Sequence, residues 1–185
     1  MKTEHKLADT LKTLMAEMPL DEISVTTLAD KCGVNRKTFY YHFHDIYDLL
    51  TLVFLDEKMP EADNSRDLKQ LIKAIYHYYS KNQKFIDATI QSAGRDLFLE
   101  FLNNICYKNI LKFITNNPNG KKIKLNDRKA IARFYASAYS NTIVYYFVTF
   151  KTKSLDGLYN CFVFQGEDNI ELSIQKTIKA REKEL

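Results

Sequence analysis

The chain has 185 residues, a net charge of +4 and 45% hydrophobic side chains, which excludes a disordered or fibrous protein and supplies enough apolar material for a core. Its 5 glycines and 3 prolines are fewer than a turn-rich sheet protein requires, so we predict an all-α fold of one or two domains. The three cysteines, Cys32, Cys106 and Cys161, form no CxxC pair, and the first ten residues contain no apolar signal segment. We therefore expect a cytoplasmic protein with reduced thiols and neither a disulfide framework nor a zinc site.

Apolar positions that recur every three to four residues predict the helices at the start of the chain. Their expected ranges are Glu4–Met18, Val25–Cys32, about Arg36–Phe43, and a fourth helix that begins at Asp45. Ser24 and Asn35 are suited to cap the second and third helices, and Gly33 suits the left-handed residue that ends the second. The boundary between two domains, 1–50 and 51–185, follows these short helices.

The second domain is predicted to be a larger helical body after a loop over Glu61–Ser65. The expected helices are Arg66–Lys81, Gln83–Ser92, Asp96–Asn116, Asp127–Phe150 and a last segment, Leu158–Glu184, interrupted near Gly166. With Lys151–Gly157 as a connector, the chain would contain about nine helices. The uncharged run Phe134–Phe150 includes several Ser, Thr and Asn residues, so a buried helix accounts for it better than a membrane span.

Residues 26–43 combine a helix, a glycine turn and a second helix that carries both basic and aromatic side chains. This is the pattern of a helix-turn-helix unit. Phe39 and Phe43 lie four residues apart and are expected to face the core, close to the small Ala29. The basic residues and tyrosines then face outward, where a phosphate backbone and base edges can meet them. Because residues 31–44 contain no acid, this stretch is locally basic although residues 1–50 are not.

The sequence from Val25 to Leu50 resembles the DNA-binding part of the TetR family of bacterial transcription regulators. The resemblance rests on residues at fixed spacing: the turn Gly33-Val34-Asn35, then Thr38, Phe39, Tyr40, Tyr41, His42 and Phe43. The run TFYYHFHDIYDLL is most similar to a branch of that family that contains an activator of a dihydroxyacetone kinase operon. The resemblance implies a three-helix DNA-binding domain over 1–50 and a helical regulatory and dimerisation domain over 51–185.

By the same resemblance, two groups of residues would contact double-stranded DNA. Those expected to approach bases or the adjacent backbone are Asn35, Arg36, Lys37, Thr38 and Tyr40. Those expected at phosphates are Thr26, Thr27, Tyr41 and His42. Lys37 stands where the family usually has a glycine, which adds a charge close to DNA. Ile46 stands where the family often has a phosphate-binding lysine, so we expect about one phosphate contact fewer, partly replaced by Lys37 or His44.

The aromatic residues of the second domain allow two interpretations. Tyr76, Tyr79, Phe98, Phe101 and Phe134 either line a ligand cavity, as the resemblance implies, or form plain core. The helix near the end of the chain has aromatic residues on several sides and must be covered on all of them. We therefore predict a homodimer formed through the last two long helices.

No catalytic, metal or cofactor site is expected. The spacing of His42 and His44 places them on different faces of a helix, and no nucleophile elbow or glycine-rich phosphate loop is present. The predicted function is a transcription regulator that binds palindromic DNA as a dimer under the control of a small-molecule effector or a protein co-regulator. The alternative is a helical ligand or protein sensor whose N-terminal module makes protein contacts instead of binding DNA.

Overall fold

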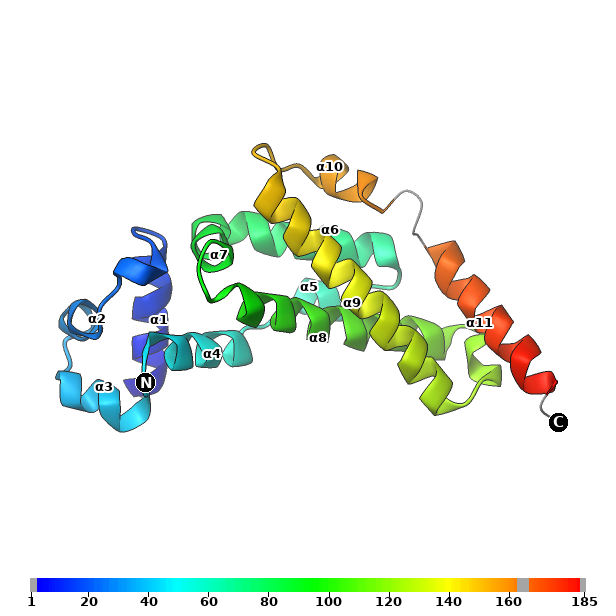
Figure 1. Ribbon diagram of the computed structural model, residues 1–185, viewed down its shortest axis with the longest axis horizontal. Coiled ribbons are helices and arrows are strands. Elements are labelled where there is room, and N and C mark those ends of the chain that lie inside the picture. Colours follow the sequence, from blue (N-terminus) through cyan, green and yellow to red (C-terminus); the bar gives the residue numbers. More distant parts are fainter. Residues whose placement is uncertain (1–2, 163–166, 184–185) are drawn as a thin grey trace. The chain divides into compact units, whose positions relative to one another are not determined.

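The computed structural model describes residues 3–162 and 167–183. Within these residues the regular structure is helical, with eleven α-helices, two short 3-10 helices and no strand (Figure 1). The predicted all-α fold is therefore confirmed. In the same residues, no helix combines the length and the apolar character that crossing a membrane requires.

The first of two compact units contains residues up to Lys58 together with Tyr79–Phe101. Its elements are α1 (Thr3–Met15), η1 (Leu20–Glu22), α2 (Val25–Cys32), α3 (Arg36–His42), α4 (Ile46–Asp56) and α7 (Gln83–Ile90). The ring of Phe54 in α4 lies 5.6 Å from that of Phe85 in α7 and 5.5 Å from that of Phe101. These aromatic contacts explain why a segment far along the chain packs with the first four helices.

The second unit contains Met59–Tyr78 and Leu102–Leu185. Its helices are α5 (Pro60–Asp63), most of α6 (Leu68–Lys81), most of α8 (Arg95–Asn116), η2 (Gly120–Lys122), α9 (Leu125–Thr149), α10 (Leu155–Asn160) and α11 (Glu167–Glu182). The predicted boundary at residue 50 divides the chain by expected role, whereas these units divide it by packing.

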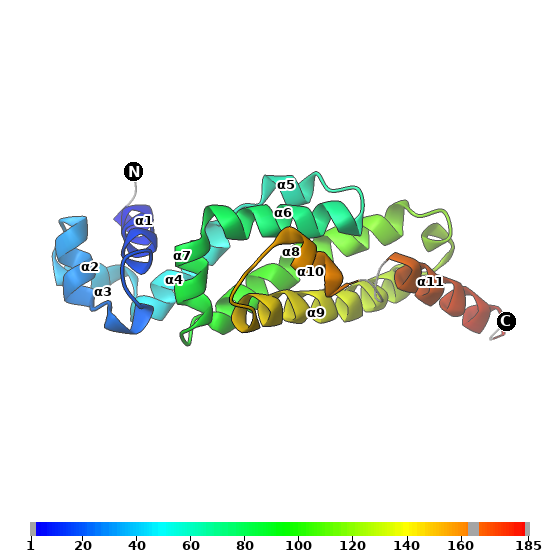
Figure 2. The ribbon, with the colours of Figure 1, turned by 90° about the horizontal axis from the view of Figure 1, so that it is seen from above.

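Side-chain hydrogen bonds to backbone carbonyls link the helices of the second unit. Tyr135 of α9 donates its hydroxyl proton to the carbonyl of Asn169 in α11, with an O···O distance of 2.7 Å. Tyr159 of α10 donates to the carbonyl of Lys69 in α6 at 3.1 Å, and Figure 2 shows α10 beside both α6 and α9. These tyrosines fill apolar space and also satisfy backbone groups.

Two helices lie where the sequence predicted a loop and a connector. The single turn of α5 begins at Pro60, a residue suited to the first helical position because its missing N–H has no partner to lose. The short α10 begins after Ser154, whose hydroxyl accepts a hydrogen bond from the N–H of Gly157 at 3.0 Å. Pro60 in α5 and the Ser154 cap of α10, rather than hydrophobic periodicity, define where these helices begin. The two helices bring the described total above the predicted nine. The predicted break near Gly166 lies outside the described residues.

Candidate nucleic-acid interface

The helix-turn-helix unit is built from two capped helices and one left-handed residue. The Ser24 hydroxyl accepts a hydrogen bond from the N–H of Thr27 at 3.0 Å and so caps α2. Gly33 ends α2 with φ of 70°, and the N–H of Val34 donates to the carbonyl of Ala29 at 3.0 Å. Because only glycine adopts this φ without steric cost, Gly33 fixes the direction in which the chain enters α3.

Two phenylalanines anchor α3. The side chain of Asn35 caps the helix by accepting from the N–H of Lys37 at 2.8 Å. Phe39 is fully buried and Phe43 nearly so, with their ring centroids 5.7 Å apart, and Ala29 of α2 is fully buried as well. The predicted inward direction of both phenylalanines is thus confirmed, although Phe43 follows the helix as an extended cap residue.

The opposite face of α3 is open to solvent. Arg36 and Lys37 are exposed and form no ion pair with any described residue. Tyr40 is 53% exposed and Tyr41 is 84% exposed. The rings of Phe39 and Tyr40 pack edge to face with their centroids 5.4 Å apart, and this contact holds Tyr40 close to the helix. The hydroxyl of Tyr40 remains free for an external partner.

Smaller polar groups surround this face. Thr26 is exposed at the first turn of α2, where its hydroxyl and the helix N-terminus favour an anion. The Thr27 hydroxyl lies 2.9 Å from the Ser24 hydroxyl, so one of its hydrogen-bonding directions is already used. Asn35 uses its side-chain oxygen as a cap and keeps its amide donor, and Thr38 is half-buried. The DNA-contacting roles of these residues stay predictions.

His42 has an intramolecular partner that the sequence did not reveal. Its Nδ1 lies 3.2 Å from a carboxylate oxygen of Glu4 in α1. The two residues are distant in the sequence, and only the packing of α1 near the end of α3 brings them together. Glu4 therefore orients the imidazole, and the phosphate contact predicted for His42 would fall to Nε2.

Another tyrosine of this unit, Tyr47, connects α4 to η1. Tyr47 donates its hydroxyl proton to a carboxylate oxygen of Asp21 at 2.8 Å. This hydrogen bond, together with burial and the negative charges of Asp21 and Asp45, raises the pKa of Tyr47 above its usual value. The neutral hydroxyl is thus the stable form, and it acts as a structural donor.

The predicted ligand-binding aromatics occupy different surroundings. Tyr79, Phe98 and Phe101 are buried in the first unit, where the Tyr79 hydroxyl donates to Asp87 at 2.9 Å. In the second unit, Tyr76 donates to the carbonyl of Lys153 at 3.1 Å. Phe134, also in the second unit, is 69% exposed on α9. Their role in ligand binding stays a prediction.

The cysteines and histidines form no cluster in the described part of the chain that could hold a metal ion. All three thiols are free, and Cys32 and Cys106 are buried. Burial raises the pKa of the Cys106 thiol to about 12, so this group is a neutral core side chain rather than a nucleophile.

Two family models match the sequence. Residues 7–53 match the model described as bacterial regulatory proteins, tetR family, and residues 66–154 match a transcriptional regulator C-terminal region. The chain belongs to the TetR family of bacterial transcription regulators. The first match spans α2, α3 and their connecting turn, so the family assignment and the open face of α3 concern the same residues. As a member of this family, the chain is a DNA-binding regulator.

Among solved structures, the fold is similar to that of the dihydroxyacetone kinase operon activator DhaS. The two chains share 22% sequence identity with a TM-score of 0.60, and the match covers 96% of this chain and 97% of DhaS. At this identity the likeness concerns the fold. No curated protein sequence matches the chain significantly.

Proposed function

We propose that this TetR-family regulator binds a palindromic DNA operator as a homodimer, with α3 of each subunit in the major groove. The observation that carries the proposal is the two-sided α3, in which buried Phe39 and Phe43 leave Arg36, Lys37 and Tyr40 open to solvent. The basic side chains supply phosphate contacts, and Tyr40 can touch a thymine methyl while its hydroxyl donates to an oxygen.

The exposed surface of α9 supports the dimer. Phe134, Tyr145, Val148 and Phe150 are exposed by 69%, 59%, 46% and 45%, and the run from Phe134 to Phe150 contains no charged residue. Apolar residues gathered on one helix in this way are typical of an interface between subunits. Dimeric helix-turn-helix proteins bind half-sites about 34–36 Å apart, one turn of DNA, and we expect the same spacing of the half-sites bound by the two α3 helices.

Control by a small-molecule effector or a protein co-regulator forms the last part of the proposal. Such a molecule shifts the regulator between states only by the difference in its affinity for them. A reporter gene placed behind the bound operator distinguishes activation, the activity named for DhaS, from repression.

The DNA proposal is tested by selecting bound sequences from random double-stranded DNA with the full chain. We expect a palindrome whose half-sites lie about one helical turn apart, with an affinity that falls as salt rises. Recovery of unrelated sequences, or binding that does not depend on Arg36, would refute it.

The dimer proposal is tested by analytical ultracentrifugation. Tyr145→Lys places a charge in the exposed apolar surface of α9 and is expected to give monomers. Thr152→Lys, at an exposed position after α9, serves as the matched control and should remain dimeric. A wild-type monomer, or a dimer unaffected by Tyr145→Lys, would contradict this arrangement.

A further inference from the structure

A groove of about 510 Å³ lies within the second unit, which contains none of the residues discussed for DNA binding. Three segments line it: the turn just before α6, the end of α8 with the residue that follows it, and the first turns of α11. Its volume falls in the range of about 300–1,000 Å³ that is typical of small-molecule sites.

The groove has an apolar wall. Ile114 of α8 and Ile170 and Ile174 of α11 are buried, and Phe113 is half-buried beside them. An apolar group of a ligand would be removed from water here, which favours binding.

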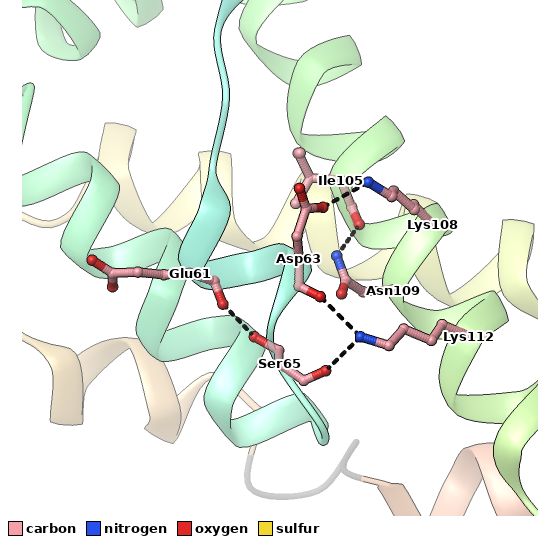
Figure 3. A network of polar contacts seen from close by, with 7 residues as sticks. All are labelled: Glu61, Asp63, Ser65, Ile105, Lys108, Asn109 and Lys112. Atoms are coloured by element: carbon pink, nitrogen blue, oxygen red, sulfur yellow. Dashed lines mark hydrogen bonds and ion pairs between the residues drawn. The ribbon is translucent and has the colours of Figure 1, made fainter.

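One cation at the groove is already engaged. Lys112 of α8 donates from Nζ to the carbonyl oxygen of Asp63 at 2.8 Å and to that of Ser65 at 3.3 Å. Figure 3 shows this ammonium group reaching the end of α5, next to Lys108, whose Nζ lies 2.7 Å from a carboxylate oxygen of Asp63. Lys112 therefore stabilises the turn between α5 and α6.

Two of the three carboxylates at the groove are engaged as well. Glu171 accepts hydrogen bonds from the side-chain amides of Asn117 and Asn119, each at 2.8 Å. Hydrogen bonds, with that from Asn119 the strongest, lower the pKa of Glu171 below its usual value. Asp67 accepts from the backbone N–H of Gln70 at 2.7 Å and from its side-chain amide at 3.0 Å. Both groups are thus committed to the fold.

Two opposite charges remain without such a commitment. Arg66 and Asp168 are exposed, line the groove, and have no side-chain hydrogen bond or ion pair with another described residue. A guanidinium group matches a carboxylate through two parallel hydrogen bonds, and a carboxylate accepts from an ammonium group.

We propose that this groove binds a small zwitterion with an apolar body, namely an α-amino acid with a large apolar side chain. Its carboxylate pairs with Arg66, its ammonium group with Asp168, and its side chain packs against the wall that contains Phe113. Three acidic side chains against two basic ones line the groove, which disfavours phosphates and other multiply charged anions. The proposal concerns the second unit alone and does not depend on DNA binding.

The test is calorimetric titration of the full chain with three probes that differ by one charged group. L-phenylalanine carries both charges, phenylpropionate lacks the ammonium group, and phenylethylamine lacks the carboxylate. We expect L-phenylalanine to bind at least about tenfold more tightly than either analogue, as the loss of one charge-assisted contact predicts.

Two variants assign each charge to its partner. Arg66→Gln should weaken L-phenylalanine and phenylpropionate about tenfold and leave phenylethylamine unchanged. Asp168→Asn should weaken L-phenylalanine and phenylethylamine and leave phenylpropionate unchanged. Arg95→Gln, which alters an exposed arginine of the first unit, is the matched control. Absence of binding by L-phenylalanine, analogues that bind as tightly as L-phenylalanine, or binding unaffected by Arg66→Gln and Asp168→Asn would overturn the proposal.

Discussion

Two adjacent residues of α3, Phe39 and Tyr40, allow stability and DNA binding to be separated. Phe39 is 0% exposed and Tyr40 is 53% exposed. Phe39→Ala removes a completely buried ring and leaves a cavity, which costs about 3–5 kcal/mol. Domains of this kind are stable by about 5–15 kcal/mol, so the urea midpoint should fall markedly. Tyr40→Ala loses an exposed ring and one aromatic contact, and should cost about 1 kcal/mol or less.

For affinity to the selected operator, the exposed Tyr40 should matter directly, although its replacement costs little stability. Tyr40→Ala is expected to weaken specific binding by about 1–3 kcal/mol, or roughly 5- to 150-fold. Fluorescence anisotropy at fixed salt measures this loss, and circular dichroism in urea measures stability. Tyr40→Phe, which keeps the ring contact with Phe39, is the matched control for stability. An unchanged urea midpoint in Phe39→Ala, or unchanged affinity in Tyr40→Ala, would refute the assignment of the two faces.

Three further perturbations probe other charges. Lys37→Gln should lower the slope of log affinity against log salt by about one. Lys73→Gln, at an exposed position of α6, is the control and should leave the slope unchanged. Equal slopes for Lys37→Gln and wild type would exclude a phosphate contact by Lys37. Lys112→Gln should lower the free energy of unfolding, measured in urea, by about 1 kcal/mol through lost hydrogen bonds to the carbonyls of Asp63 and Ser65, and an unchanged free energy would show that they contribute nothing. A hydrogen bond from Arg181 holds the pKa of Asp127 below its usual value. The ionised Asp127 therefore stabilises the folded protein at any pH above its pKa in the unfolded chain, and this contribution is lost as the pH falls through its lower pKa in the folded protein. Thermal unfolding of Arg181→Gln should accordingly converge with wild type in acid, and a difference independent of pH would contradict this.

The first four helices could be predicted because their signals are local. Apolar residues every three to four positions define the buried faces, the Ser24 and Asn35 caps define the starts of α2 and α3, and Gly33 defines the end of α2. The observed bounds of α2, Val25–Cys32, agree with the prediction. By contrast, the single turn of α5 is too short to show periodicity, and contacts from Lys112 stabilise its end.

The candidate site was partly predictable for the same reason. The four-residue spacing of Phe39 and Phe43 indicates which side of α3 is buried, and the structure agrees. The pairing of His42 with Glu4 could not be predicted, because it depends on how α1 packs and not on any local pattern. The groove lined by Arg66 and Asp168 is likewise a product of tertiary structure, since its three segments are far apart in the sequence.

The packing of α7 limits how any effector signal reaches α3. Lys12 of α1 lies 3.0 and 2.9 Å from the two carboxylate oxygens of Glu57 and 5.2 Å from the centre of the Phe85 ring in α7. Through the chain, α7 is joined to α6 and α8, which both continue into the second unit. A ligand that binds the second unit can therefore alter DNA binding through α6 and α8 if the protein state that it prefers has a different packing of α7 on α1. A ligand that binds both packings of α7 equally would leave DNA affinity unchanged, however tightly it binds.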